Sequence, residues 1–273
     1  MLLPLQGRRL YYDLTGPEDA PTICITHSLA SDGGSWSEQV PALLAGGFRV
    51  LRLDMRGHGG SDPVSGDYTM TALADDVAAA LQALGIPRVH YLGLSIGGMI
   101  GQAFALGHGE RLISAMWCDT LPESPKGADE IWAQRLNTVR SANSLAPLAD
   151  ATVERWLTDD FKARHPGRWR QIRDTVTGTT PAGYLSCCAA ILDFDFVPRL
   201  PSVRLPTLVL CGADDAGTPA SENRRLAGLV PGARYEEMAG CRHFPNVERP
   251  DQFNRIMMGW LETQKRTRRG QQE

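Results

Sequence analysis

The sequence has no long apolar run and no strong excess of charge of one sign. Its 273 residues include 28 Lys and Arg against 31 Asp and Glu, which gives a formal net charge of -3. Nucleic-acid-binding domains carry a broad basic surface, so this balance argues against a nucleic-acid partner. A membrane-spanning helix needs about 20 mostly apolar residues, and no stretch of the sequence approaches that length. We therefore expect neither nucleic acid nor a membrane among its partners.

The cysteine patterns of metal and redox sites are also missing. The six cysteines form no Cys-x-x-Cys pair and no zinc-type spacing with histidine. The sequence lacks the basic segment followed by an apolar one that marks a secretory signal peptide. We therefore expect a cytoplasmic protein without a metal or cofactor, and we leave the oligomeric state open. An apolar fraction of 42% with 22% charged residues predicts an ordinary folded core.

Short apolar segments alternate with longer amphipathic ones through the first 120 residues. Helical periodicity is clearest over residues 71–84, where leucine and valine share one face and where Gly85 and Pro87 end the pattern. Branched and aromatic residues predict buried strands on either side of such helices, over residues 22–26, 48–53, 89–94 and 112–117.

The alternation fails over residues 121–199 and then returns. This stretch holds three of the six tryptophans and predicts several helices without strands. After it we expect a strand, a helix, a strand and a last helix, over residues 207–211, 222–229, 234–236 and 252–262.

This order of elements predicts an α/β fold with a mostly parallel, doubly wound sheet and a helical cap insertion. The core domain would comprise residues 1–120 and 200–264, and the cap would comprise residues 121–199. A basic run near the C-terminus predicts a flexible tail over residues 265–273.

Residues 93–97 form a Gly-x-Ser-x-Gly motif with Ser95 at its centre. The motif has chemical meaning when it joins a strand to a helix, and here the predicted strand 89–94 precedes it and an apolar helical segment, residues 96–106, follows. Its glycines are needed because the serine occupies a strained turn in which flanking side chains would collide with the neighbouring strand and helix. Ser95 is therefore the candidate nucleophile.

A serine hydroxyl is a weak nucleophile unless a histidine takes its proton and an acid orients that histidine. Of the histidines well beyond Ser95, His165 lies in the polar insertion beside Pro166. His243 lies in the loop between the last predicted strand and the last predicted helix, beside the other loops at strand carboxyl ends. We therefore take His243 as the candidate base.

Three aspartates could orient His243. Asp214 and Asp215 both follow the predicted strand 207–211, and adjacent residues are not expected to point at one imidazole. Asp119 follows the predicted strand 112–117, a position at which some hydrolases carry the acid. Spacing alone leaves these alternatives open.

Together these motifs resemble the α/β-hydrolase fold superfamily over nearly the whole chain. The matching segments are residues 27–29, 54–61, 93–97 and 212–219, with His243. In that family the acid commonly stands four residues before the proline of a Thr-Pro pair, which selects Asp215. The backbone N–H groups of Ile96 and, by the resemblance, Leu29 would form the oxyanion hole. Ser28 departs from the His-Gly pair that many relatives have before the second donor.

Within the superfamily, residues 27–32, 54–62 and 68–70 are similar to those of 3-oxoadipate enol-lactonases, which open a small carboxylated enol-lactone. Trp132 and Arg135 stand three apart in a predicted cap helix and would share one face. They could offer an apolar wall and a cation to a substrate carboxylate. In the alternative interpretation, Trp132 packs the cap and Arg135 is solvated.

We therefore expect a serine hydrolase that cleaves a small-molecule ester or lactone through an acyl-serine. General carboxylesterases and cofactor-free perhydrolases share the same motifs and remain alternatives. A ligand-binding homologue without catalysis is a further one, because fold does not fix function. Haloalkane dehalogenases and epoxide hydrolases have aspartate at the nucleophile position, so Ser95 argues against both.

Overall fold

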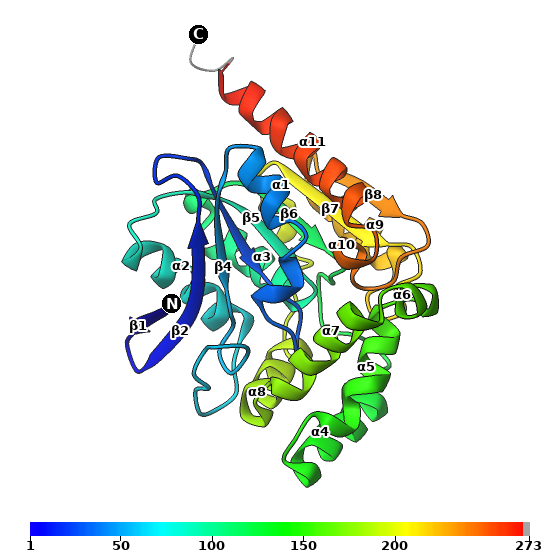
Figure 1. The fold of residues 1–273 in the computed structure, drawn as a ribbon. Coiled ribbons are helices and arrows are strands. Elements are labelled where there is room, and N and C mark those ends of the chain that lie inside the picture. Colours follow the sequence, from blue (N-terminus) through cyan, green and yellow to red (C-terminus); the bar gives the residue numbers. More distant parts are fainter. Residues whose placement is uncertain (270–273) are drawn as a thin grey trace.

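A computed structural model describes residues 1–269, in which eight strands form one sheet with a helical layer at the end of its strands (Figure 1). The strand order is β1-β2-β4-β3-β5-β6-β7-β8, and all neighbours from β4 to β8 are parallel. This is the expected α/β fold with a mostly parallel, doubly wound sheet. The strands are β1 (Leu2–Leu5), β2 (Arg8–Thr15), β3 (Thr22–Thr26), β4 (Arg49–Leu53), β5 (Val89–Leu94), β6 (Leu112–Cys118), β7 (Thr207–Gly212) and β8 (Arg234–Met238).

The first two strands were not expected from the sequence. β1 and β2 form an antiparallel hairpin at one edge of the sheet, and β2 continues it by pairing with β4. Of the eight residues of β2, only Leu10 is buried. Because an antiparallel edge can face water, this strand lacks the continuous apolar run that marks the buried parallel strands.

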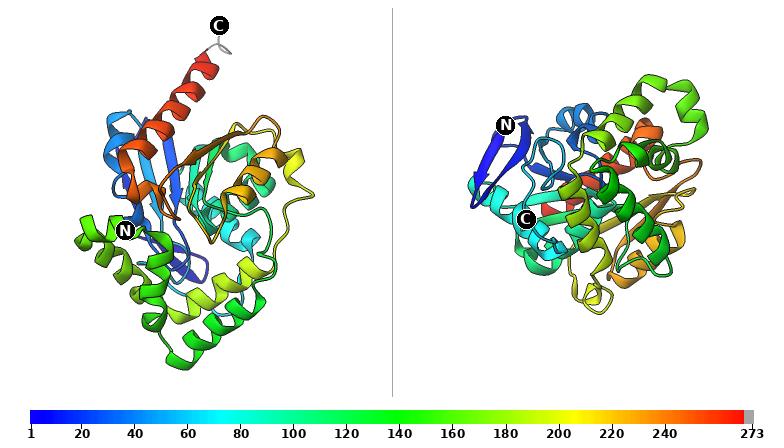
Figure 2. Two further views of the ribbon diagram at one scale, coloured as in Figure 1. Left: turned by 90° about the vertical axis from the view of Figure 1, so that its right-hand side faces the viewer. Right: turned by 90° about the horizontal axis from the view of Figure 1, so that it is seen from below.

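Helices cover both faces of the sheet. α1 (Val40–Ala45) packs against α11 (Pro250–Arg269), and α2 (Met70–Ala83) packs against α3 (Ile96–Gly107). Figure 2 places these two pairs on opposite sides of the sheet, and α9 (Ala220–Leu229) packs on β7 and β8. Strands β3, β5 and β7 are buried at every position, which explains why their sequences are mostly apolar.

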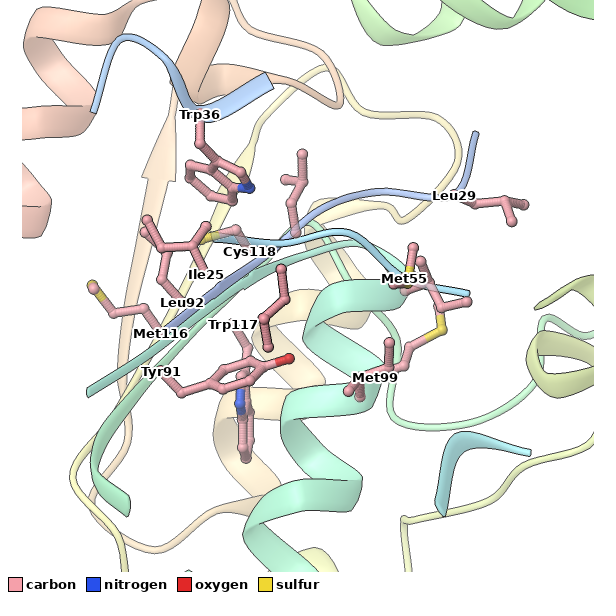
Figure 3. Close-up of a cluster of buried hydrophobic side chains, with 14 of the residues drawn as sticks. Ile25, Leu29, Trp36, Met55, Tyr91, Leu92, Met99, Met116, Trp117 and Cys118 are labelled. Atoms are coloured by element: carbon pink, nitrogen blue, oxygen red, sulfur yellow. The ribbon is translucent and has the colours of Figure 1, made fainter. Parts of the chain in front are cut away.

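The core is packed closely where α3 crosses the sheet (Figure 3). Tyr91 on β5 and Trp117 on β6 are fully buried there. A Cβ at Gly101 of α3 would lie 2.5 Å from the Tyr91 ring and 2.8 Å from that of Trp117. Glycine at this position thus lets α3 lie directly on these two rings. This contact fixes the position of α3, and the first turn of α3 follows Ser95.

Five helices between β6 and β7 form a layer beyond the carboxyl ends of the strands (Figure 1). In residues 121–199 the only β pairing described is an isolated bridge between Glu123 and Asp195. The helices are α4 (Asp129–Ala142), α5 (Ala149–Trp156), α6 (Asp159–Arg164), α7 (Pro166–Gly178) and α8 (Pro181–Leu192). We call these five helices the helical insertion.

The last helix, α11, is longer than the sequence predicted. We expected a tail over residues 265–273, but the helix continues to Arg269. The Lys265 ammonium group donates a hydrogen bond to the Gly46 carbonyl at 2.9 Å, so the basic run begins within a packed helix. Residues 270–273 of the expected tail lie outside the described residues. Neither α11 nor any other helix in the described part of the chain is long and apolar enough to cross a membrane.

Candidate active site

Ser95 occupies a strained turn between β5 and α3. Its backbone has φ 59° and ψ -119°, a conformation that costs a non-glycine residue roughly 1 to 3 kcal/mol. The surrounding structure holds it there: the Ser95 N–H donates to the Cys118 carbonyl at 2.8 Å, and the Thr120 hydroxyl donates to the Ser95 carbonyl at 2.8 Å. Ser95 is 8% exposed, and it lines a cavity between the sheet and the helical insertion.

Both glycines of the motif are required by close backbone contacts. A Cβ at Gly97 would lie 2.8 Å from the Thr26 carbonyl oxygen, and a Cβ at Gly93 would collide with the Gly97 carbonyl. The turn can therefore pack against β3 only when these two positions lack side chains, as the sequence analysis expected.

His243 and Asp215 meet beside the same cavity. The imidazole Nδ1 lies 2.6 Å from Oδ2 of Asp215, and both residues are buried. Because Nδ1 faces a carboxylate, it carries the proton, and Nε2 is left as a proton acceptor. Asp215 receives further hydrogen bonds from the Gly217 N–H at 2.8 Å and from the Thr218 hydroxyl.

Asp215 is held in its charged form. Burial alone would raise its pKa, but the charge and hydrogen bond of His243, with those from Thr218 and Gly217, lower it to about 2. Asp214, the neighbouring alternative, is exposed, and its backbone N–H donates to the Cys241 carbonyl at 2.9 Å. The structure therefore pairs His243 with Asp215, the residue that the family resemblance selects.

The His243 loop is tied to the helical insertion. The ring of Trp156, at the end of α5, lies 6.3 Å from the His243 ring at an interplanar angle of 28°. The Phe244 N–H donates to the Trp156 carbonyl at 3.2 Å, and the Arg242 guanidinium donates to the Leu157 carbonyl at 2.9 Å. These contacts fix the imidazole from the side opposite the sheet. The other candidate base, His165, is exposed before α7.

The cavity has an apolar wall and two arginines. Trp132 and Arg135, which the sequence analysis singled out together, both line it, and the Arg135 guanidinium lies 5.2 Å from the centre of the Trp132 ring. Arg155 of α5 lines the same cavity. The apolar lining comes from both sides and includes Leu29, Met99, Leu121, Trp132, Trp156 and Ile191.

Arg135 and Arg155 are cations without an acidic partner in the described part of the chain. Burial and the charge of Arg135 lower the pKa of Arg155, so the two guanidinium groups lie within electrostatic reach of each other. Asp215, the acidic residue of the cavity lining, is already paired with His243. The cavity therefore has positive charge available to an anionic ligand.

The predicted oxyanion donors are Leu29, which lines the cavity with Ser95, and Ile96, which follows Ser95 in the chain. Leu29 lines the cavity in the loop after β3, where the Ser31 N–H donates to the Ser28 carbonyl at 3.2 Å. Ile96 is the first residue of α3, whose N-terminal N–H groups have no partner within the helix. Their role as a pair stays a prediction.

Asp119 is buried behind this arrangement. One side-chain atom each from Asp119, Asp215 and His243 lies within 4.8 Å of the others, a grouping that could ligate a metal ion. Here, however, the Asp215 and His243 atoms are hydrogen-bonded to each other, and Oδ1 of Asp119 accepts from the Gly212 N–H at 2.8 Å. The arrangement favours proton handling over metal ligation, and Asp215 rather than Asp119 is the partner of His243.

Comparison with known proteins places this geometry in a family. Residues 21–250 match the sequence profile of the alpha/beta hydrolase fold family. The chain belongs to this family. It is 30% identical to 3-oxoadipate enol-lactonase 1 of Acinetobacter baylyi over 263 residues. The aligned region covers 96% of this chain and 97% of that protein.

Solved structures agree with this assignment. The enol-lactonase of Burkholderia xenovorans LB400 is 36% identical to this α/β hydrolase and has a TM-score of 0.91, covering 96% of this chain and 100% of its own. A thermophilic esterase of Thermogutta terrifontis is 28% identical with a TM-score of 0.87, covering 94% of each chain. The resemblance inferred from the motifs, including that to enol-lactonases, is confirmed, and the chain is a hydrolase of the α/β fold.

Sequence reasoning missed three residues of the site in this α/β hydrolase. Thr218 belongs to the Thr-Pro pair that located Asp215, so that motif could have suggested its hydrogen bond to the carboxylate. Arg155 and Trp156 end α5. Trp156 stacks on His243 and Arg155 lines the cavity, and both placements depend on how the helical insertion packs on the core. No local pattern marks them.

Proposed function

We propose that this α/β hydrolase cleaves small carboxylic esters or lactones through an acyl-enzyme on Ser95. One observation carries the proposal: Ser95 and His243 line the same cavity, and an ionised Asp215 holds the far side of the His243 ring. This is the arrangement that a serine nucleophile needs, with a base in the correct tautomer and an acid that keeps it so.

In the first half of the proposed reaction, Ser95 Oγ attacks the substrate carbonyl carbon. His243 Nε2 takes the hydroxyl proton, and the imidazolium is stabilised by Asp215 at Nδ1. The N–H groups of Leu29 and Ile96 bind the oxyanion, where the loss of one donor costs about 2.7 to 4 kcal/mol in a well-studied enzyme. The carbon–oxygen bond of the ester or ring then breaks, and His243 returns the proton to the leaving oxygen.

Water completes the reaction in the second half. His243 takes one proton from a water molecule while the water oxygen attacks the acyl carbon. The bond from that carbon to Ser95 Oγ breaks, and Ser95 recovers its proton from His243. The product acid leaves as a carboxylate, so the overall reaction consumes one water and needs no cofactor.

The first candidate substrate is a small enol-lactone that carries a carboxylate. Two features support it: the enol-lactonase relatives, and the positive charge of Arg135 and Arg155 at an otherwise apolar cavity. A guanidinium group binds a carboxylate through paired, charge-assisted hydrogen bonds, and Trp132 and Trp156 would pack against the ring. The six buried, free cysteines support the cytoplasm as the compartment of this reaction.

Labelling with a fluorophosphonate probe tests the reaction type. We expect one covalent adduct, located on Ser95 by peptide mass spectrometry, and none in Ser95→Ala. A folded wild-type protein that stays unlabelled would favour the non-catalytic, ligand-binding alternative.

A substrate panel tests specificity within the reaction type. It compares short aryl esters, unsubstituted lactones and 3-oxoadipate enol-lactone by kcat/KM, with hydrogen peroxide added in a parallel series to detect perhydrolysis. The proposal predicts the highest kcat/KM for the carboxylated lactone. Equal or faster turnover of neutral esters would indicate a general carboxylesterase, and peroxide-dependent peracid formation would indicate a perhydrolase.

A further inference from the structure

Asp119 lies behind the Asp215 and His243 pair and has no role in the reaction described above. It follows β6 with φ 43°, in the left-handed region, and its side chain is completely buried. Oδ1 accepts a hydrogen bond from the Gly212 N–H at 2.8 Å. Oδ2 is buried as well, and no donor within residues 1–269 reaches it. A buried oxygen without a partner is rare enough to need a physical explanation.

Asp119 and Asp215 are too close to carry two charges in a buried site. Their carboxyl groups each place an oxygen within 4.8 Å of the other and of a His243 nitrogen. Two carboxylates in such a site share a proton, because the second charge lacks water to solvate it. Asp215 receives hydrogen bonds from His243, Thr218 and Gly217, all of which favour its ionised form.

Asp119 has a much poorer set of donors than Asp215. The Gly212 N–H is the donor described for it, and it occupies Oδ1. A proton on Oδ2 would remove the charge and would also turn the unpaired oxygen into a donor, for which the nearby Asp215 carboxylate is an acceptor. Protonation therefore explains both the missing partner and the proximity of the two acids.

We propose that Asp119 is protonated in the resting enzyme and that its Oδ2–H donates a hydrogen bond to the Asp215 carboxylate. Asp119 is then a positioning residue, since it acts on the reaction through Asp215 and His243. Its hydrogen bond fixes the Asp215 carboxylate and disperses part of its negative charge. Through that charge, Asp119 sets how firmly His243 holds a proton, an inference that rests on the proposed function.

The other titratable groups around Asp119 favour the same protonation state. Burial raises its pKa well above the usual range, the charge of Asp215 adds to this, and Glu248 of α10 (Pro245–Glu248) contributes in the same direction, against the opposing Gly212 N–H. The remaining neighbours are the thiols of Cys118, Cys211 and Cys241, whose pKa values are raised by burial, so they are neutral at working pH.

The variant Asp119→Asn separates a protonated from an ionised Asp119. Asparagine is neutral, can accept from Gly212 and donate to Asp215, and tolerates the left-handed region. Because this variant changes neither the charge nor the hydrogen bond to Asp215, we expect the acidic limb of kcat/KM against pH to stay within about 0.3 pH of wild type. If Asp119 were ionised, its loss would remove a negative charge near His243 and move the limb down by about 1 pH or more. That downward movement would overturn the proposal.

A second variant, Asp119→Ala, removes the hydrogen bond to Asp215. The carboxylate then acts with its full charge on His243 and stabilises the imidazolium, so the acidic limb moves up by about 0.5 to 1 pH. A purely structural role would lower the thermal midpoint and leave the limb in place. An unchanged limb in folded Asp119→Ala would therefore contradict the proposal.

A measurement that needs no turnover keeps this test independent of the proposed function. Protein labelled with carboxyl-13C aspartate should show a signal at the protonated chemical shift at pH 7 that Asp119→Asn removes. Its absence would overturn the proposal for Asp119 and leave the chemistry of Ser95 untouched. If the signal is present but Ser95 takes no fluorophosphonate label, the proposed function fails and the protonated acid remains.

Discussion

The two sides of the cavity are built in opposite ways. On the sheet side, Ser95, Asp215 and His243 are 8%, 4% and 6% exposed, and hydrogen bonds at their backbone or side-chain atoms hold them. On the side of the helical insertion, Trp132 and Arg135 are half-buried. Their described contact is with each other, with the Arg135 guanidinium over the Trp132 ring.

This difference separates chemistry from selection. Proton transfer depends on distances of a few tenths of an ångström, so a rigid edge of strand ends suits the reacting groups of the proposed reaction. Recognition of a substrate carboxylate leaves cations unpaired until the ligand arrives, and Arg135 and Arg155 meet that condition among the described residues. Changes on the sheet side should therefore alter the rate for every substrate, whereas changes on the insertion side should alter it for some.

The largest effect is expected at Ser95. Ser95→Ala should lower kcat by about 10^4-fold or more for every substrate tested, because no nucleophile replaces the hydroxyl. The thermal midpoint should change little, since the side chain faces the cavity. Retention of more than about a hundredth of kcat would show that Ser95 does not form the acyl-enzyme.

Asp215→Asn should have the next largest effect, a fall in kcat of about 10^3 to 10^4-fold. The amide can donate to Nδ1, which favours the wrong imidazole tautomer and removes the charge that stabilises the imidazolium. Asp214→Asn is the matched control, because Asp214 is adjacent but exposed and should leave kcat within about twofold. Similar losses in both variants would contradict the choice of Asp215.

The sheet side was predictable from sequence because its signals are local. The five residues 93–97 contain the strained turn, and the segment that ends in a Thr-Pro pair places Asp215 just beyond β7. Parallel strands bring their carboxyl ends to one edge, so Ser95, Asp215 and His243 had to approach each other once the fold was known.

The insertion side was only partly predictable because its geometry depends on long-range packing. The three-residue spacing of Trp132 and Arg135 suggested a shared face, and the structure places both on the cavity. Arg155 carries no such spacing signal, and it reaches the cavity because α5 packs over His243. The missed hairpin of β1 and β2 has a related cause, since its pairing partner β4 lies more than 30 residues away and its exposed face needs no apolar pattern.

Loss of both cavity arginines should affect one substrate class. The double variant Arg135→Ala with Arg155→Ala should lower kcat/KM for a carboxylated lactone by about 100-fold, roughly tenfold for each charge-assisted hydrogen bond. Turnover of a neutral short ester should change by less than about threefold, because Ser95 and its partners are untouched. The ratio of the two kcat/KM values is the measurement.

Arg140→Ala is the control for this experiment. Arg140 lies on the same helix as Arg135, so its loss removes one positive charge without changing the cavity lining. An equal loss for neutral and carboxylated substrates in the double variant would show that the arginines stabilise the fold rather than select a substrate. A selective loss for the carboxylated lactone in Arg140→Ala would indicate attraction by overall charge.

The smallest expected effect is a difference in acid stability between the two sides. Asp215 has a pKa of about 2 in the folded protein, against about 3.9 in an unfolded chain. Since the folded value is the lower one, its contribution of about 2 to 3 kcal/mol is present above pH 4 and is lost as the pH falls from about 4 to 2. The raised pKa of Asp119 has the opposite sign, so its contribution is complete at low pH and declines as the pH rises above about 4.

Urea unfolding at pH 5 and at pH 2.5 measures this difference. Between the two pH values, the free energy of unfolding of Asp215→Asn should fall by about 1 to 2 kcal/mol less than that of wild type, because the titrating carboxyl group is gone. Arg135→Ala should show the wild-type loss, because Arg135 pairs with no acid among the described residues. If Asp215→Asn lost as much unfolding free energy as wild type, the fold would not be stabilising the Asp215 charge. The contrast between the sheet side and the insertion side would then have no electrostatic basis.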